Sequence, residues 1–371
     1  AVPRPSASVI LVSPANHILL LQRVAGASSF PAAHVFPGGN LSGFHDGAVP
    51  APASPLRHLD GPAYRRAALR ECFEECGVLL ARPAAPARAS ARARAQTHLL
   101  PLGDAERELG RREVHADRVR FGVWVASKGG ELDVEGLLPF TRWVTPPGVA
   151  RRFTTQMYLY FLPTAAPDAA PGDAADAAAV AVAVAADAPR AIPVPTPDGG
   201  REHTTARFLP ATAWLRLARQ SRILLFPPQF LLLHHLATYL DAPPPGHAPT
   251  PPAAHAAADA DADADAEAND VPVSRAEREA RRERLRGFVT DSKATTWPAW
   301  KDKVICPAVV RGVPRRADGR VVLGLDGPGP ELRGSGPRGE GELCLLVRRE
   351  REGPRGLEVV GREAVGGGGR L

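Results

Sequence analysis

The stretch "RECFEECGV", residues 70–78, places three carboxylates on one face of a short helix. Glu71, Glu74 and Glu75 follow the i, i+3, i+4 spacing at which side chains are neighbours on a helix surface. The pattern predicts a helix over 62–81, with a proline near its start. The opposite face of this helix is apolar and is expected to pack into the core: Leu69, Cys72, Phe73 and Cys76.

Three adjacent carboxylates repel one another unless positive charge neutralises them. Carboxylate oxygens suit a hard divalent cation such as Mg²⁺ or Mn²⁺, so Glu71, Glu74 and Glu75 are candidate metal ligands. Arg70 lies four residues before Glu74 and is expected to pair with that carboxylate and orient it. The alternative is an ordinary solvated helix face, because charged faces are common on surface helices.

A second stretch, "FPGGN" at 36–40, precedes the glutamates. Two β-rich segments, 6–13 and 17–24, predict an antiparallel hairpin, and 33–39 is expected to be a third strand that enters a glycine turn. Glycine allows a backbone to approach a site more closely than any other residue, so Gly38 and Gly39 are candidate substrate-binding residues.

Together these stretches resemble the signature of the Nudix hydrolases, whose second half reads Arg-Glu-U-x-Glu-Glu-x-Gly-U, with U a bulky aliphatic residue. Residues 70–78 follow that pattern with Cys72 at the first aliphatic position, and Gly39 matches the opening glycine. The resemblance implies an α+β fold, a Nudix-like α/β/α sandwich with a mixed sheet. It also implies a hydrolase that acts on acid anhydrides of phosphorus, with Glu74, Glu75 and Arg70 as catalytic residues.

Two departures from the signature indicate a branch of the family. The interval from Gly39 to Arg70 is longer than in the family pattern, and Pro62 occupies the position of the first signature glutamate. An insertion of this kind, followed by "RWVTP", "RRF" and "PPQ", resembles the peroxisomal and mitochondrial acyl-coenzyme-A diphosphatases. That branch carries Asp after "RRF", whereas this chain has Thr154.

The chain is expected to have three parts. Residues 1–241 form the Nudix domain, with a helical insertion at 82–139 and an Ala/Asp-rich low-complexity insertion at 164–193. Residues 242–270, a run of alternating Ala and Asp, are expected to be a disordered linker. Residues 271–371 add a charged, solvated helix at 274–287 and short strands that form a small C-terminal β-element, either a separate unit or an extension of the main sheet. In the insertion we expect these residues to point inward: Leu99, Leu109, Phe121, Val123 and Trp124.

Composition and termini bear on the partners and location. The formal charge of +6 suits an anionic small molecule or loose nucleic-acid contact, but the basic residues are not interleaved with aromatic ones as nucleic-acid stacking requires. Four scattered cysteines favour a reduced, intracellular protein over a disulfide scaffold. No apolar run is long enough for a membrane span. The ending Gly369-Arg370-Leu371 resembles a peroxisomal address without matching it, which leaves peroxisome, mitochondrion and cytoplasm open.

The expected function is divalent-metal-dependent cleavage of a diphosphate linkage in a nucleoside-diphosphate-linked substrate, with acyl-coenzyme A or coenzyme A favoured. Arg151 and Arg152 are candidate phosphate contacts, since a guanidinium matches phosphate geometry; ordinary strand-end charges are the alternative. The 227–229 "PPQ" segment is expected to shape a helix start, with substrate contact as the alternative. The runner-up function is a catalytically inactive Nudix-fold binding or regulatory protein.

Overall fold

The computed structural model describes residues 2–24, 26, 32–84, 99–163, 195–196, 203–241, 273–291, 298–313, 316–335 and 338–365. The low-complexity segments expected at 164–193 and 242–270, and the residues 369–371, lie outside the described ranges. Within those ranges, no helix has the length and apolar character that crossing a membrane requires.

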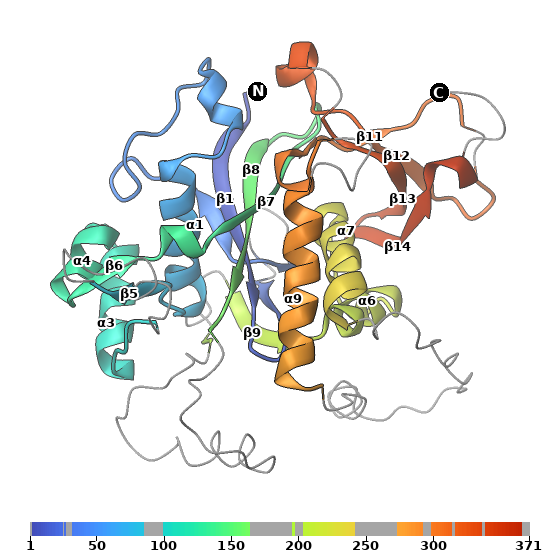
Figure 1. Ribbon diagram of the computed structural model, residues 1–371. Helices are drawn as coiled ribbons and strands as arrows, with labels where there is room; N and C mark the ends of the chain where they lie inside the picture. Colours follow the sequence, from blue (N-terminus) through green and yellow to red (C-terminus); the bar gives the residue numbers. More distant parts are fainter. Residues whose placement is uncertain are drawn as a thin grey trace.

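A mixed sheet forms the centre of the protein (Figure 1). Its strand order is β10-β7-β8-β1-β2-β3, with β4 paired to β1 and β9 paired to β2. The central pair, β1 and β8, is parallel, and its neighbours β2 and β7 are antiparallel to them. The strands are β1 (Arg4–Val12), β2 (Ile18–Arg23), β3 (His34–Val35), β4 (Gly38–Asn40), β7 (Leu138–Val144), β8 (Phe153–Phe161), β9 (His203–Leu209) and β10 (Val304–Ile305).

Helices cover both faces of this sheet because successive residues of its central strands point to opposite sides. Along β1, Val9 and Leu11 pack with α1 (Pro62–Cys76), α3 (Asp104–His115) and α4 (Phe121–Ser127). Ile10 and Val12 pack on the other side with α6 (Ala211–Arg219), α7 (Pro227–Leu236) and α9 (Arg275–Thr290). Figure 1 shows these two helical layers on either side of the strands. The expected α/β/α sandwich with a mixed sheet is confirmed.

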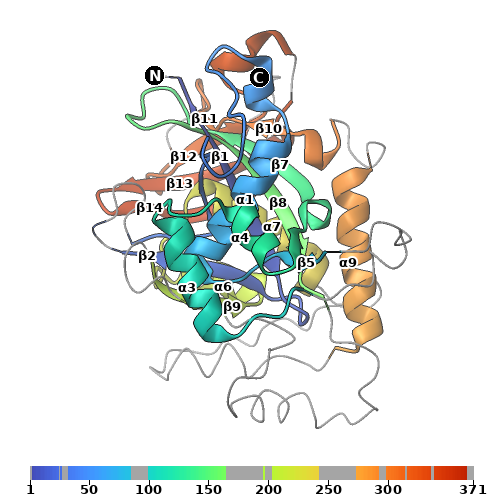
Figure 2. The same ribbon diagram turned by 90° about the vertical axis from the view of Figure 1, so that its left-hand side faces the viewer.

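The inserted segment after α1 is only partly helical. α3 and α4 are joined to a two-stranded sheet of β5 (Ala81–Pro83) and β6 (Gly130–Leu132). Figure 2 shows this group packed beside α1. Leu99, Phe121 and Trp124 are buried as expected, but the expectation is wrong for Leu109 and Val123, which are 53% and 59% exposed. Both residues lie on the outer faces of their short helices, because each helix packs through one side only.

The C-terminal strands form both of the arrangements that the sequence left open. β10 extends the main sheet by pairing in parallel with β7. A separate antiparallel sheet has the order β11-β12-β13-β14, with β11 (Ala308–Val309), β12 (Val321–Leu325), β13 (Glu340–Glu350) and β14 (Gly353–Gly361). One face of this sheet joins the core beneath α6 and α7.

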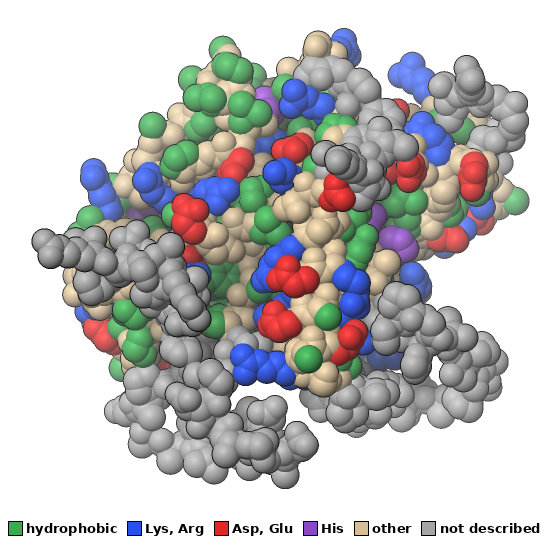
Figure 3. Space-filling view, in the orientation of Figure 1, with side chains coloured by type: hydrophobic (Ala, Val, Ile, Leu, Met, Phe, Trp, Pro, Cys, Tyr) green, Lys and Arg blue, Asp and Glu red, His purple; other side chains and the backbone are tan. Residues whose placement is uncertain are grey.

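Helix α9 is less solvated than its sequence suggests. Arg and Glu side chains gather over its outer surface (Figure 3), but Arg282, Leu285 and Val289 are buried on its inner face. Arg282 donates from Nε to Asn16 Oδ1 at 2.8 Å and from Nη2 to the Ser13 carbonyl at 2.7 Å. The guanidinium therefore ties α9 to the β1–β2 turn.

Single-turn helices complete the structure. They are η1 (Pro55–His58), η2 (Val134–Gly136), η4 (Trp300–Asp302), η5 (Pro330–Ser335), η6 (Arg362–Ala364) and a π-helical turn, η3 (Ala237–Asp241). All four cysteines are free and buried, as expected of a reduced protein.

Candidate active site

Helix α1 carries the candidate carboxylates and is fixed at both of its faces. Leu69, Cys72, Phe73 and Cys76 are fully buried against the sheet and the inserted helices, as the sequence predicted. The helix ends earlier than expected, at Cys76, because Gly77 adopts a left-handed conformation with φ 71° and its N–H caps the Phe73 carbonyl at 2.9 Å.

The "FPGGN" stretch does not form the expected turn at its glycines. Gly38–Asn40 is extended as β4 and pairs antiparallel with β1, with Gly39 opposite Ala7. The glycines are required by space rather than by backbone conformation. A Cβ on Gly38 would lie 2.4 Å from the Ala7 carbonyl oxygen, and one on Gly39 would lie 2.6 Å from the carboxylate of Glu71.

Two of the three glutamates lie against β4. Glu75 Oε2 accepts a hydrogen bond of 2.7 Å from the Gly38 N–H. The Glu71 carboxylate lies over Gly39 and is 2.9 Å from Arg70 Nη1. Glu74 turns away toward α3, where its Oε2 is 3.2 Å from Arg70 Nη1 and 3.7 Å from His115 Nδ1. The glycine backbone was expected to lie close to the candidate site, and it lies against Glu71 and Glu75.

Arg70 holds this cluster together. Besides Glu71 and Glu74, its guanidinium donates to both carboxylate oxygens of Asp46, at 3.1 and 3.0 Å, and to the Asn40 carbonyl at 2.9 Å. Burial alone would lower the pKa of Arg70, but the surrounding carboxylates raise it, so the guanidinium stays charged. Asp46 lies in the long loop between β4 and α1 and is fully buried. Sequence analysis did not identify it.

Burial also affects Glu71. It raises the pKa of Glu71 from 4.5 to about 7, although the positive charge of Arg70 opposes the shift. The neighbouring carboxylates of Glu74 and Asp46 push in the same direction as burial. Glu71 is therefore a carboxylate that lacks sufficient positive charge in its surroundings.

Arg111 of α3 fixes the C-terminal end of α1. It is buried and donates to the carbonyls of Glu74 and Glu75, at 2.7 and 2.6 Å. These carbonyls belong to the last turn of the helix, which lacks partners within the helix itself. Buried His203 of β9 lies beside Glu75, with Nε2 3.7 Å from Oε1. Sequence analysis identified neither residue.

The donor set suits a hard divalent cation, although the carboxylates do not converge on one point. Among the described residues, no three His, Cys, Asp or Glu side chains form a group that could hold a metal as they lie. The reason is visible in the contacts, since Arg70 lies between Glu71 and Glu74 while Glu75 is bound to β4. Three carboxylates, those of Asp46, Glu71 and Glu74, share this one guanidinium, and the resulting excess of buried negative charge is what a dication would neutralise.

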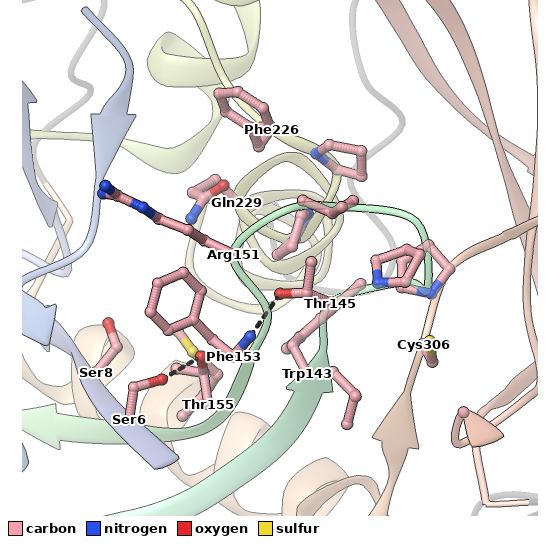
Figure 4. A pocket seen from close by; sticks show the side chains of 18 of the residues that line it. Ser6, Ser8, Trp143, Thr145, Arg151, Phe153, Thr155, Phe226, Gln229 and Cys306 are labelled. Atoms are coloured by element: carbon pink, nitrogen blue, oxygen red, sulfur yellow. Dashed lines mark hydrogen bonds between the residues drawn. The ribbon is translucent and has the colours of Figure 1, made fainter. Parts of the chain in front are cut away.

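A pocket of about 1540 Å³ opens beside β4. Gly38, Gly39, Glu71, Glu75 and Arg151 line it, whereas Glu74, Arg70 and Arg152 are not part of its lining. Figure 4 shows the facing side chains of adjacent strands, with Ser6 of β1 and Thr155 of β8 joined by a 2.6 Å hydrogen bond.

Arg152 has a structural partner instead. It donates from Nε to the Thr145 carbonyl at 3.0 Å and forms a bidentate ion pair with Glu331 of η5. Thr154, which differs from the branch pattern, is buried and outside the lining, and its Oγ1 lies 3.0 Å from His58 Nδ1. In contrast, Pro227, Pro228 and Gln229 begin α7 and also line the pocket. Gln229 is labelled in Figure 4.

Comparison with known proteins gives both curated and structural similarities. No family model matches the sequence. The acyl-coenzyme A diphosphatase NUDT19 of Gallus gallus is 32% identical over 190 residues, which cover 40% of this chain and 49% of the relative. The chain therefore spans about half the length of the curated relative that it matches.

Solved structures of Nudix hydrolases also align with the chain. A Nudix hydrolase from Alicyclobacillus acidocaldarius is 20% identical, with 64% of this chain and 91% of that chain covered and a TM-score of 0.45. A MutT Nudix hydrolase from Burkholderia pseudomallei is 12% identical, with 62% and 96% covered and a TM-score of 0.27.

Two features of this structure resemble the Nudix hydrolases. One is the mixed sheet with helices on both faces, and the other is the glutamate-bearing helix α1 packed against β4. The similarity to NUDT19 narrows this resemblance from the whole family to the acyl-coenzyme-A diphosphatase branch. The resemblance expected from residues 36–40 and 70–78 is thus confirmed.

Proposed function

We propose that this protein hydrolyses the diphosphate linkage of a nucleoside-diphosphate-linked substrate, with acyl-coenzyme A or coenzyme A as the favoured substrate. One observation carries the proposal. Glu71 and Glu75, from the helix that resembles the Nudix signature, line a large pocket exactly where the backbone of Gly38 and Gly39 forms its wall.

We assign divalent-metal binding to Glu71, Glu74 and Glu75, with Mg²⁺ or Mn²⁺ as the ion. When bound, such an ion supplies Lewis acidity, which neutralises charge on phosphate oxygens and acidifies water. The protein's own residues then divide the remaining tasks. Arg70 keeps the carboxylates in place through its contacts with Glu71 and Glu74. Gly38 and Gly39 allow β1 and the Glu71 carboxylate to lie against β4, because a Cβ on either glycine would collide with them, and the glycine backbone at the pocket wall is proposed to contact the substrate.

In this scheme Glu75 or Glu74 accepts the proton of the attacking water. Glu75 is the better placed of the two, since it lines the pocket and Glu74 does not. Arg151, at the pocket rim, is proposed to contact a phosphate through its guanidinium. Arg152 would act indirectly, because its ion pair with Glu331 holds η5 near the rim. Water adds to one phosphorus as the bridging P–O bond breaks, so acyl-coenzyme A would give 3′,5′-ADP and acyl-phosphopantetheine.

The test is a substrate panel with and without Mn²⁺ or Mg²⁺. Coenzyme A esters, dinucleoside polyphosphates, ADP-ribose and NADH would be incubated with the full chain and their products identified by mass spectrometry. We expect metal-dependent cleavage of the coenzyme A esters, with most turnover lost in Glu74→Gln and Glu75→Gln. Glu283→Gln, on the exposed face of α9, is the control. Absence of turnover on the whole panel would contradict the proposal and favour a non-catalytic binding protein.

An intracellular location, with peroxisome and mitochondrion as alternatives to the cytoplasm, stays a prediction. Imaging of the tagged protein against organelle markers would distinguish the three.

A further inference from the structure

The C-terminal sheet forms one wall of the pocket. Its apolar residues Val309, Leu323 and Val347 line the cavity. Three arginines from the same part of the chain line it as well, namely Arg311 after β11, Arg333 in η5 and Arg349 near the end of β13. The wall therefore combines apolar surface with three positive charges.

These three guanidiniums differ from their neighbours in their electrostatic surroundings. Within the described ranges, no carboxylate lies at ion-pair distance from Arg311, Arg333 or Arg349, and all three side chains are exposed. Other arginines of the same segment do have carboxylate partners: Arg316, Arg320, Arg348, Arg355 and Arg362.

The acidic residues of this wall do not cancel its charge. Asp326 and Glu350 line the pocket, but Asp326 is 2.9 Å from Arg362 Nη2 and Glu350 is 3.7 Å from Arg348 Nη1. Both of these arginines lie outside the lining. The pocket therefore faces three positive charges whose neutralisation is left to a ligand.

The positive wall is separated from the glutamates. Gly38, which binds Glu75, pairs with Ser8 of β1. Figure 4 shows Ser8 and Cys306 on opposite sides of the pocket, and Cys306 is in the loop that leads into β11. The volume of about 1540 Å³ exceeds the roughly 300–1,000 Å³ typical of small-molecule sites, so an extended ligand can reach from one side to the other.

We propose that Arg311, Arg333 and Arg349 form a second anion-binding wall, which binds a phosphate of the substrate other than those of the cleaved diphosphate. Guanidinium groups bind phosphate through paired, charge-assisted hydrogen bonds, which suits them to a terminal phosphate monoester. The substrate class is then a nucleoside-diphosphate derivative that carries an additional phosphate monoester. This inference rests on the proposed function, since it assumes that the diphosphate lies at the glutamates.

A matched pair of variants tests the wall. Arg349→Gln removes a charge that lines the pocket. Arg351→Gln removes a nearby charge in the turn after β13, which is also exposed but lies outside the lining and has no carboxylate at ion-pair distance among the described residues. Each is assayed on coenzyme A and on 3′-dephospho-coenzyme A, which has the same diphosphate without the extra phosphate. We expect Arg349→Gln to raise KM for coenzyme A by at least about tenfold, with kcat and both constants for the dephospho form unchanged. Arg351→Gln should match the unmodified protein on both substrates.

The triple variant of Arg311, Arg333 and Arg349 to Gln should abolish the preference for the phosphorylated substrate. Equal losses on both substrates, or no loss with coenzyme A in the triple variant, would overturn the inference. A melting curve for each variant separates loss of binding from loss of folding.

A binding measurement separates this inference from the proposed function. Calorimetry with 3′,5′-ADP requires no turnover. If the protein hydrolyses neither substrate but binds 3′,5′-ADP, and Arg349→Gln weakens that binding while Arg351→Gln does not, the wall stands and the hydrolase proposal fails. If hydrolysis occurs but the Arg349→Gln affinity for 3′,5′-ADP equals that of Arg351→Gln, the wall is refuted alone.

Discussion

The two glycines of β4 should respond in opposite ways to the same substitution. In Gly38→Ala the new Cβ would meet the backbone of β1, 2.4 Å from the Ala7 carbonyl oxygen and 2.6 Å from Ser8 Cα. In Gly39→Ala the three atoms nearest to the new Cβ would all belong to the carboxylate of Glu71, at 2.6 Å. A backbone strand cannot move aside without loss of pairing, whereas a carboxylate at the end of a side chain can rotate away.

The magnitudes follow from what each residue must displace. Ordinary contact begins at 3.4 Å, so β1 and β4 must separate locally by about 1 Å in Gly38→Ala. Overpacking of this kind costs about 1–3 kcal/mol, and the hydrogen bonds that flank the site, such as Val9 N–H to the Pro37 carbonyl at 2.9 Å, add about 1 kcal/mol if lost. The total of about 2–4 kcal/mol corresponds to a fall in Tm of roughly 4–16 °C.

Gly39→Ala should lower stability less than Gly38→Ala, since it displaces only the Glu71 end of the cluster and Arg70 keeps its contacts with Asp46 and Glu74. Its effect should fall on hydrolysis, because displacement of a catalytic group by about 1 Å can reduce the rate a hundredfold. The assay is a melting curve and a metal-dependent hydrolysis rate for each variant. Gly43→Ala is the control, since a Cβ there has nothing within 4 Å.

Either of two results would refute this reasoning. If Gly39→Ala lowers Tm as much as Gly38→Ala, the Glu71 side chain is not free to move. If Gly39→Ala keeps full activity, the position of Glu71 against β4 does not matter for catalysis.

Three further predictions concern the surroundings of the site. Glu75→Gln should lose most turnover and keep its Tm. Cys76→Ala should keep turnover and lose about 1 kcal/mol of stability, because Cys76 is fully buried. Hydrolysis rates and melting curves of both variants test this pair, and the opposite pattern would contradict it. Arg111→Gln should cost about 2–3 kcal/mol, as it removes charged donors from the last turn of α1, and an unchanged Tm would contradict this. Despite its partial burial, Glu331 has its pKa lowered from 4.5 by hydrogen bonding to Arg152, so its ion pair stabilises the fold above pH 4.5 and is lost as pH falls. Glu331→Gln should therefore make Tm fall less steeply below pH 4.5. If the dependence of Tm on pH is unaltered in this variant, the ion pair between Glu331 and Arg152 is not the cause of the fall.

The sequence predicted those parts of the molecule that depend on periodicity within one segment. The hairpin of β1 and β2, the buried face of α1 and the carboxylate spacing all follow from patterns over a few residues. The strand conformation of Gly38 and Gly39 could not be predicted in this way, because it depends on pairing with β1, about 30 residues earlier in the chain. Likewise, Leu109 and Val123 are apolar but do not pack into the core, because α3 and α4 are covered on one side only.

The residues that hold the candidate site together come from segments that the signature does not contain. Asp46, from the long loop before α1, fixes Arg70, and Arg111, from the insertion after α1, fixes the carbonyls of Glu74 and Glu75. Neither has a motif, since a charged residue in a loop or an amphipathic helix is ordinary until its partner is known. The same holds for the pocket wall made by β11 to β13, more than 200 residues after the glutamates. Because the loop before α1 and the insertion at 82–139 both contact α1, and the C-terminal sheet lines the pocket, removal of any one of these three segments should alter the candidate site itself and not merely the periphery of the fold.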